Sequence, residues 1–302
     1  MNFPKAAGSF LLTLDGAQIS AYVRAVDGGF VKAAVVDEPI GPENLRIKHT
    51  SVAEIDPFAF EIGLAGSKKV LELIAASWKK NFQRFNGQVS HGDMNRTGFG
   101  TQEFRDALIT ETTFPALDAK STEAPYLKVK MLPEFVTYAP DDSHLHGQTE
   151  ITQKEWSVNN FRLTIDGVAT ANVQKIESFS VKQSVKKYYV GRDRFPQIEP
   201  TKVEFPNIVA TLAEAGAKPV LDWYRSFLHK GQPDPRAERA GAIEFLSPDL
   251  KRVMLRINLK QVGLASAQLI GSQANQKAVK LCKFELYVGA MDIDFGASVG
   301  LT

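Results

Sequence analysis

The polar residues that could perform chemistry gather in one short segment, Asp141-Asp142-Ser143-His144-Leu145-His146. Two histidines separated by one residue can bind zinc from a strand, and neighbouring carboxylates can complete the ligand shell. Such a site is typical of a metal-dependent hydrolase. The other histidines, His49, His91 and His229, are scattered along the chain, and none pairs clearly with this segment. The residues favour a solvated linker, and a metal-dependent hydrolase using Asp141–His146 is the alternative.

Other signatures of catalysis are missing from the sequence. It contains no P-loop, no nucleotide-binding glycine motif after a strand and no Gly-x-Ser-x-Gly. Carboxylate pairs such as Asp37-Glu38 have the character of turn or surface residues instead of a glycosidase acid/base pair. The single cysteine, Cys282, lies in an apolar run, which predicts a buried structural thiol. We therefore expect a protein without metal or cofactor that is not an enzyme.

The elements that would position any site occur twice, half a chain apart. Three short matches follow one another in the same order in both halves. They are Phe10-Leu-Leu-Thr-Leu-Asp-Gly16 with Phe161-Arg-Leu-Thr-Ile-Asp-Gly167, Ile55-Asp-Pro57 with Ile198-Glu-Pro200, and Ala65-Gly-Ser-Lys-Lys-Val-Leu71 with Ala215-Gly-Ala-Lys-Pro-Val-Leu221. Three ordered matches predict a duplicated domain.

The length and the charge distribution fit two domains. A chain of 302 residues is long enough for two domains of about 100–150 residues, each with its own core. We predict a first domain at 1–137, a linker at 138–159 and a second domain at 160–302. Residues 1–150 contain 15 Lys and Arg residues and 19 Asp and Glu residues, a net charge of −4. Residues 151–302 contain 21 and 15, a net charge of +6. Opposite charges would attract copies head to tail, and drift between two exposed surfaces explains the imbalance equally well.

Membrane and secretion signals are absent from the sequence. No apolar run approaches the ~20 residues of a membrane-spanning helix. The first residues, Met1-Asn-Phe-Pro-Lys5, lack the apolar core of a secretory signal. We expect the chain to be made in the cytoplasm.

Each half is predicted to open with a strand and to contain one helix. Alternate apolar residues lie on one face of the opening strand, and Asp-Gly closes it with turn chemistry. Ser67 is predicted to cap a helix, and Pro219 suits the first turn of its counterpart. The apolar stripes of these helices are Val70, Leu71, Ile74, Trp78 and Phe82, and Val220, Leu221, Tyr224 and Phe227.

The remaining pattern predicts a mainly β fold. Segments 25–54 and 174–199 show few clear periods and are expected to be irregular. Strands are expected to follow the helix in each half. The fold class is therefore mainly β with minor α: two tandem antiparallel β-barrel or sandwich domains, each with one flanking helix.

The order of these motifs resembles the tail tube proteins of contractile-tailed bacteriophages and related contractile injection systems. The shared features are a strand ending in Asp-Gly, a long hairpin segment, Ile-[Asp/Glu]-Pro before a strand, a glycine before the single helix and closing strands. The resemblance covers residues 8–137 and again 158–298. Typical subunits of this family carry one copy, and this chain carries two.

The resemblance implies how the chain assembles. In this family small β-barrels join edge to edge into six-membered rings, and a long loop reaches the neighbouring ring. That loop corresponds to Val31–Lys48 in the first copy and to Lys182–Phe195 in the second. Aromatic and Arg residues are enriched at protein interfaces, which fits the second loop. Its expected assembly residues are Lys186, Lys187, Tyr188, Tyr189, Arg192, Arg194 and Phe195.

Several functions remain open at this stage. The leading one is a structural subunit whose stacked rings form the inner tail tube, with itself, sheath and baseplate proteins as partners. DNA or effector cargo would pass through the lumen without sequence-specific binding, and the final location would be a virion tail or an injection particle. The alternative in the same class is a trimeric baseplate hub or tube-initiation protein with pseudo-sixfold symmetry. A solvated basic loop, or a carbohydrate- or nucleic-acid-binding module, remains open for the Lys182–Phe195 segment.

Overall fold

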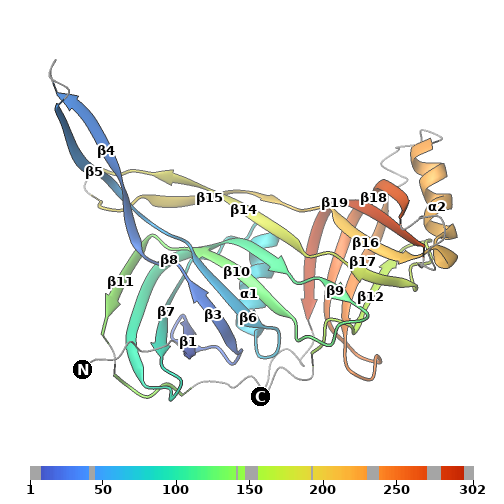
Figure 1. Ribbon diagram of the computed structural model, residues 1–302, viewed down its shortest axis with the longest axis horizontal. Helices are drawn as coiled ribbons and strands as arrows, with labels where there is room; N and C mark the ends of the chain where they lie inside the picture. The colour runs from blue at the N-terminus through green and yellow to red at the C-terminus, as the bar shows by residue number, and fades with distance from the viewer. Residues whose placement is uncertain are drawn as a thin grey trace.

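The computed structural model describes residues 8–40, 45–140, 142–146, 156–191, 193–229, 238–270 and 280–295. Within them the fold is mainly antiparallel β, with two α-helices, as the sequence predicts. Figure 1 shows two curled sheets beside each other, joined by long strands that run between them. We call Ser9–Ala139 the first repeat and Phe161–Phe295 the second repeat.

The first repeat curls its strands around an apolar core. Its sheet runs in the order β2-β1-β7-β8-β10-β6-β3, and β11 also pairs with β8. The strands are β1 (Ser9–Leu14), β2 (Ala17–Gln18), β3 (Val23–Asp27), β6 (Phe58–Gly63), β7 (Phe85–Gly92), β8 (Gly98–Phe114), β10 (Tyr126–Leu132) and β11 (Phe135–Ala139). Helix α1 (Lys68–Trp78) follows β6.

The second repeat has the same strand order. Its sheet runs β12-β17-β18-β19-β16-β13, which matches β1-β7-β8-β10-β6-β3 strand for strand. The strands are β12 (Phe161–Ile165), β13 (Val173–Ile176), β16 (Ile208–Ala213), β17 (Arg239–Leu246), β18 (Val253–Ile270) and β19 (Leu281–Phe295). Helix α2 (Lys218–Tyr224) follows β16, after a 3₁₀ turn at Glu214–Gly216, and continues as a π-turn at Arg225–His229.

The opening strands and their turns form as predicted. Leu12 and Leu14 of β1 are fully buried, because alternate side chains of a strand point to one face. The backbone then enters the left-handed region at Asp15 and Gly16, with φ of 49° and 78°. Glycine and aspartate tolerate this region, so the Asp-Gly pair allows the tight return of the chain.

The predicted apolar stripe of the second helix is only partly confirmed. Val220 and Phe227 are buried, whereas Leu221 and Tyr224 are only partly buried.

Helix α1 buries its predicted stripe, with a difference at each end. Val70, Leu71, Ile74 and Trp78 are buried, but α1 ends at Trp78 and Phe82 lies beyond it. Ser67 is the N-cap residue of α1 as predicted, but its side chain makes no capping hydrogen bond, because its hydroxyl donates to the Leu64 carbonyl oxygen at 2.6 Å.

The two segments expected to be irregular contain long hairpins. They are β4 (Val31–Ile40) with β5 (Leu45–Ile55), and β14 (Phe179–Tyr188) with β15 (Gln197–Glu204). The hairpins occupy the same place in each repeat, since Lys32 lies opposite Glu54 and Lys182 lies opposite Glu204.

This register corrects one of the three sequence matches. Ile55 ends β5 and leads into β6, whereas Ile198 lies near the start of β15. The residue of the second repeat that corresponds to Ile55 is Phe205, the first residue after Glu204. The Ile-[Asp/Glu]-Pro match is therefore not at equivalent positions.

The segment predicted as a linker is packed against the first repeat where the structure describes it. Leu145 is buried, and its backbone N–H donates to the Arg96 carbonyl oxygen at 2.8 Å. Trp156 and Val158 also belong to the buried core. Residues 141 and 147–155 lie outside the described part of the chain. No helix among the described residues is both long enough and apolar enough to span a membrane.

Candidate assembly surface

The two repeats share a continuous sheet. Strand β14 of the second repeat lies antiparallel to the end of β8, with Phe179 opposite Phe114 and Lys182 opposite Glu111. In the other direction, the short strand β9 (Leu117–Asp118) pairs with β13. In Figure 1 the β14–β15 hairpin extends from the second repeat across to the first. Strand pairing therefore joins the repeats through their backbones.

A cluster of aromatic side chains fills the junction beneath this pairing. Phe114 stacks on Phe179 with ring centroids 5.2 Å apart and an interplanar angle of 13°. Trp78 meets Phe114 and Phe205 edge-on, each at 6.0 Å, and Phe114 also lies 6.2 Å from Phe245. Edge-to-face and offset pairs at such spacings are the favoured aromatic arrangements. The cluster takes side chains from both repeats, so their cores are continuous.

Polar contacts hold the hairpin farther along the first repeat. The Ile198 backbone N–H donates to Glu134 Oε1 at 2.8 Å, and Arg84 both pairs with Glu134 and donates to the Ile198 carbonyl oxygen. The Ile198 side chain is buried against Leu108 and Leu132. Both backbone groups of Ile198 are thereby satisfied by charged side chains, which form the stronger kind of hydrogen bond.

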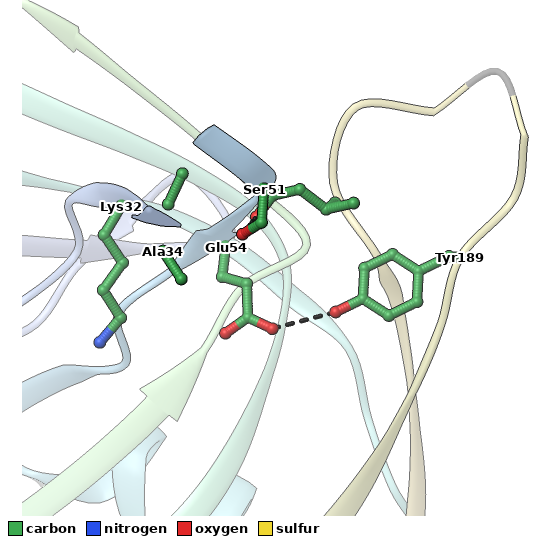
Figure 2. Close-up of a pocket in the computed structure, with 7 residues that line it drawn as sticks. Lys32, Ala34, Ser51, Glu54 and Tyr189 are labelled. Carbon is green, nitrogen blue, oxygen red and sulfur yellow. Dashed lines mark hydrogen bonds between the residues drawn. The ribbon is translucent and has the colours of Figure 1, made fainter. Parts of the chain in front are cut away.

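The tip of the hairpin carries the residues predicted for assembly, and two of them contact Glu54 of β5. Lys187 Nζ lies 2.9 Å from one carboxylate oxygen of Glu54, and the Tyr189 hydroxyl donates to the other at 3.0 Å. Figure 2 shows the hydrogen bond between Tyr189 and Glu54 at an open pocket between the two hairpins, which Lys32 and Ser51 also line.

These contacts shift the ionisation of both partners. The hydrogen bonds from Lys187 and then Tyr189 hold the pKa of Glu54 below its ordinary value, because both stabilise the carboxylate. The pKa of Tyr189 is raised, chiefly by its hydrogen bond to Glu54, which favours the protonated phenol. The contact is thus present when Glu54 is ionised and is lost as pH falls through its lowered pKa.

Of the other residues predicted for assembly, one packs against the first repeat and others are exposed. Phe195 contacts Phe135 of β11 edge-on at 6.1 Å, and Arg194 lies over the Phe195 ring at 6.0 Å. Tyr188 remains 44% exposed, with Lys186 Nζ 5.0 Å from its ring centre. Arg192 lies outside the described residues. The predicted segment therefore contacts the first repeat of its own chain and leaves Tyr188 and Arg194 at the surface.

The first-repeat counterpart, Val31–Lys48, forms most of the β4–β5 hairpin. Figure 1 shows this hairpin projecting away from the body of the first repeat. Its large apolar residues are exposed, with Val35 at 65% and Ile47 at 55%. Residues 41–44 lie outside the described part of the chain.

The metal candidate has two neighbouring imidazoles. The rings of His144 and His146 have centroids 5.0 Å apart, and the main chain between them is anchored by the buried Leu145. Among the described residues, no group of three His, Cys, Asp or Glu side chains is placed to hold a metal ion. Asp141 is outside those residues. Cys282 is buried as predicted, and burial raises the pKa of its thiol.

One family model matches the second repeat. Residues 157–291 match the family model described as T4-like virus tail tube protein gp19. This match covers nearly all of the second repeat and leaves the first repeat outside it. A comparison with curated proteins finds no match.

Solved structures with a similar chain come from contractile assemblies. One is the sheath-tube complex of the PVC extracellular contractile injection system in the extended state, at 16% identity and a TM-score of 0.39, covering 46% of this chain and 93% of that chain. The tube-terminating cap of the anti-feeding prophage gives the same four values. The anti-feeding prophage baseplate gives 14% identity and a TM-score of 0.35, covering 45% and 92%.

The aromatic junction gives a first prediction. Phe114→Ala should lower the free energy of unfolding by about 3–5 kcal/mol, because it removes a fully buried ring that contacts both repeats. Met94→Ala, at a side chain that is 82% exposed, should change it by less than about 0.5 kcal/mol. Chemical denaturation followed by tryptophan fluorescence measures both. Equal effects from the two variants would contradict the role given to Phe114.

The hairpin contact gives a second prediction. Lys187→Met and Tyr189→Phe should each raise the pKa of Glu54 toward its ordinary value, because each removes a hydrogen bond to the carboxylate. Tyr188→Phe is the matched control and should leave that pKa unchanged. Carboxyl-carbon NMR with labelled glutamate measures the titration, and Glu54→Gln assigns the signal. An unchanged pKa in both test variants would show that the contact does not form in solution.

Proposed function

We propose that the chain is a structural subunit of a contractile tail or injection particle, because residues 157–291 match the family model of the T4-like tail tube protein gp19. Its repeats act as two tube-type domains, at 1–137 and 160–302. Stacked rings of these domains form the inner tube, through which DNA or effector cargo passes. The function is mechanical and requires no catalytic group.

The observation that carries this proposal is the sheet that continues from one repeat into the other. Strand β14 extends the sheet of the first repeat by four paired positions on β8. Unpaired backbone groups make a sheet edge adhesive, and joining edges around a ring satisfies them. The chain therefore already contains one edge-to-edge junction of the kind that a ring of tube-type domains needs.

A second candidate lies in the same class and rests on the repetition of the fold. If both repeats occupy one ring, three chains supply six domains, which suits a baseplate hub or a tube-initiation protein. If one repeat lies outside the tube, six chains form the ring instead. The shared sheet at the junction favours two repeats side by side in one ring.

Proposed partners follow from the same premise. The chain binds copies of itself within and between rings, and sheath and baseplate proteins contact the assembled tube. The residues proposed to contact the neighbouring ring are Lys186, Lys187, Tyr188, Tyr189, Arg192, Arg194 and Phe195. The protein is made in the bacterial cytoplasm and ends in the virion tail or the injection particle.

Electron microscopy of the purified chain tests the function directly. We expect rings or short tubes at high protein concentration, because pairing between open sheet edges drives association. Ring mass and symmetry then separate three chains from six. A strictly monomeric species at high concentration would contradict the structural role.

Contact between rings is tested by reversing the charge of an exposed loop residue. Arg194→Glu should reduce stacking of rings into tubes without unfolding the chain, because Arg194 is exposed and its only described contact is with the adjacent Phe195 ring. Lys251→Glu, an exposed residue in the turn before β18, is the control for net charge. Tube length in negative stain and the circular dichroism melting curve are the measurements. Tubes of normal length from Arg194→Glu would remove this loop from the stacking contact.

A further inference from the structure

One edge of β8 is paired in the first repeat, and among the described residues the corresponding edge of β18 has no partner strand in the second. At Glu111–Thr113, β8 pairs with β10 on one side and with β14 on the other. Strand β18 pairs with β19 as far as Ile270, but β17 covers its other side only as far as Val262. In the described part of the chain, no strand lies against that other side at Ser266–Ile270.

The ladders of the two repeats show which residues correspond. In the first repeat, Phe60 of β6 is aligned with Thr112 of β8 through the strand between them, β10. In the second repeat, Ala210 of β16 is aligned in the same way with Ala267 of β18 through β19. Ser266–Leu269 is therefore the counterpart of the segment that receives β14.

Two apolar side chains at this open edge lack the cover that their counterparts have. Phe114 is fully buried at the junction, while the corresponding Leu269 is 46% exposed. Trp78, at the end of α1, is 5% exposed, whereas Leu228, at the same distance from the start of α2, is 40% exposed. Both differences lie where the second repeat would meet a further domain.

The hairpin of the first repeat carries the complementary surface. Val31-Lys32 at the start of β4 corresponds to Val181-Lys182 in β14, by sequence and by hairpin register. Val181 is 2% exposed because β14 lies on β8, whereas Val31 is 44% exposed and the adjacent Phe30 is 60% exposed. Strand β4 pairs only with β5 among the described strands. The other edge of β4 therefore has no partner among the described strands. The equivalent edge of β14 is the one that pairs with β8.

We propose that the β18 edge of one copy receives the β4–β5 hairpin of a second copy, antiparallel and with Val31 opposite Ala267. Figure 1 supports a head-to-tail arrangement of the two copies, since β4–β5 lies at one end of the molecule and α2 at the other. The net charges of −4 and +6 on the two halves favour the same head-to-tail contact. The proposal deepens the proposed function and rests on it only for closure into a ring. A heterologous contact gives a ring if its rotation closes and an open filament if it does not.

Disulfide trapping tests the register. Ser180 and Thr113 are opposite at the existing junction, with hydroxyl oxygens 2.7 Å apart, and their counterparts are Phe30 and Gln268. The double variant Phe30→Cys with Gln268→Cys should form disulfides between chains under mild oxidation, giving multiples of the chain mass on a non-reducing gel. The buried Cys282 does not compete. Each single variant, and Phe30→Cys with Met94→Cys, should stay at the mass of one chain.

Surface substitutions test the energetics. Leu269→Ser and Leu228→Ser should each raise the concentration needed for association roughly tenfold, because each removes apolar area that the contact buries. Both side chains are substantially exposed in the single chain, so its melting temperature should hold. Met94→Ser is the control. Sedimentation velocity measures association, and circular dichroism measures folding.

The outcomes separate this contact from the proposed function. Rings or tubes that form without the trapped disulfide, and that tolerate both leucine variants, would overturn the contact and leave the function standing. Trapped chains that form only open filaments would support the contact and contradict the ring. A disulfide found only within single chains, or no association at any concentration, would overturn the contact.

Discussion

The structure depends on the backbone groups at the end of β8. This strand has 17 residues, and β7 covers one of its sides only as far as Ala107. The N–H and C=O groups beyond that point would be left unpaired in a half-buried position, which is costly. Strand β14 supplies the partners, and it does so from the other repeat. The join between the repeats is therefore part of the sheet, and the repeats are not two independent bodies in contact.

Side-chain packing follows from that pairing. Once Phe179 lies opposite Phe114, the two rings stack, and Trp78 reaches both Phe114 and Phe205. At the far end of the hairpin, Glu134 and Arg84 satisfy the backbone of Ile198. Directional hydrogen bonds set the register, and apolar burial supplies most of the free energy. The same division explains why the partly exposed ion pair between Lys187 and Glu54 at the hairpin tip contributes little to stability.

Local patterns in the sequence predict the elements whose burial is complete within one repeat. Leu12 and Leu14 alternate because one face of β1 is buried, and Val70, Leu71 and Ile74 follow helical spacing for the same reason. The β4–β5 hairpin could not be predicted this way, because both of its faces are largely exposed and no alternation results. Pairing between β8 and β14 was also invisible, since it joins residues about 70 positions apart without any local signal. The candidate loop was located from family resemblance, and its contacts with Glu54 and Phe135 needed the fold.

The junction between the repeats of one chain differs in composition from the proposed contact between two copies, and that difference has a physical consequence. Within the chain, the first junction forms at the high effective concentration that a covalent link provides, so its large aromatic surface is buried as the protein folds. The proposed contact between copies presents Leu228 and Leu269 where the junction within the chain has Trp78 and Phe114, so a smaller apolar area is exposed before assembly. A tandem chain thus makes one junction permanent and leaves the other weaker and dependent on concentration. Such an arrangement lets folded subunits accumulate singly and associate only when enough copies are present, which an equally aromatic second junction would oppose.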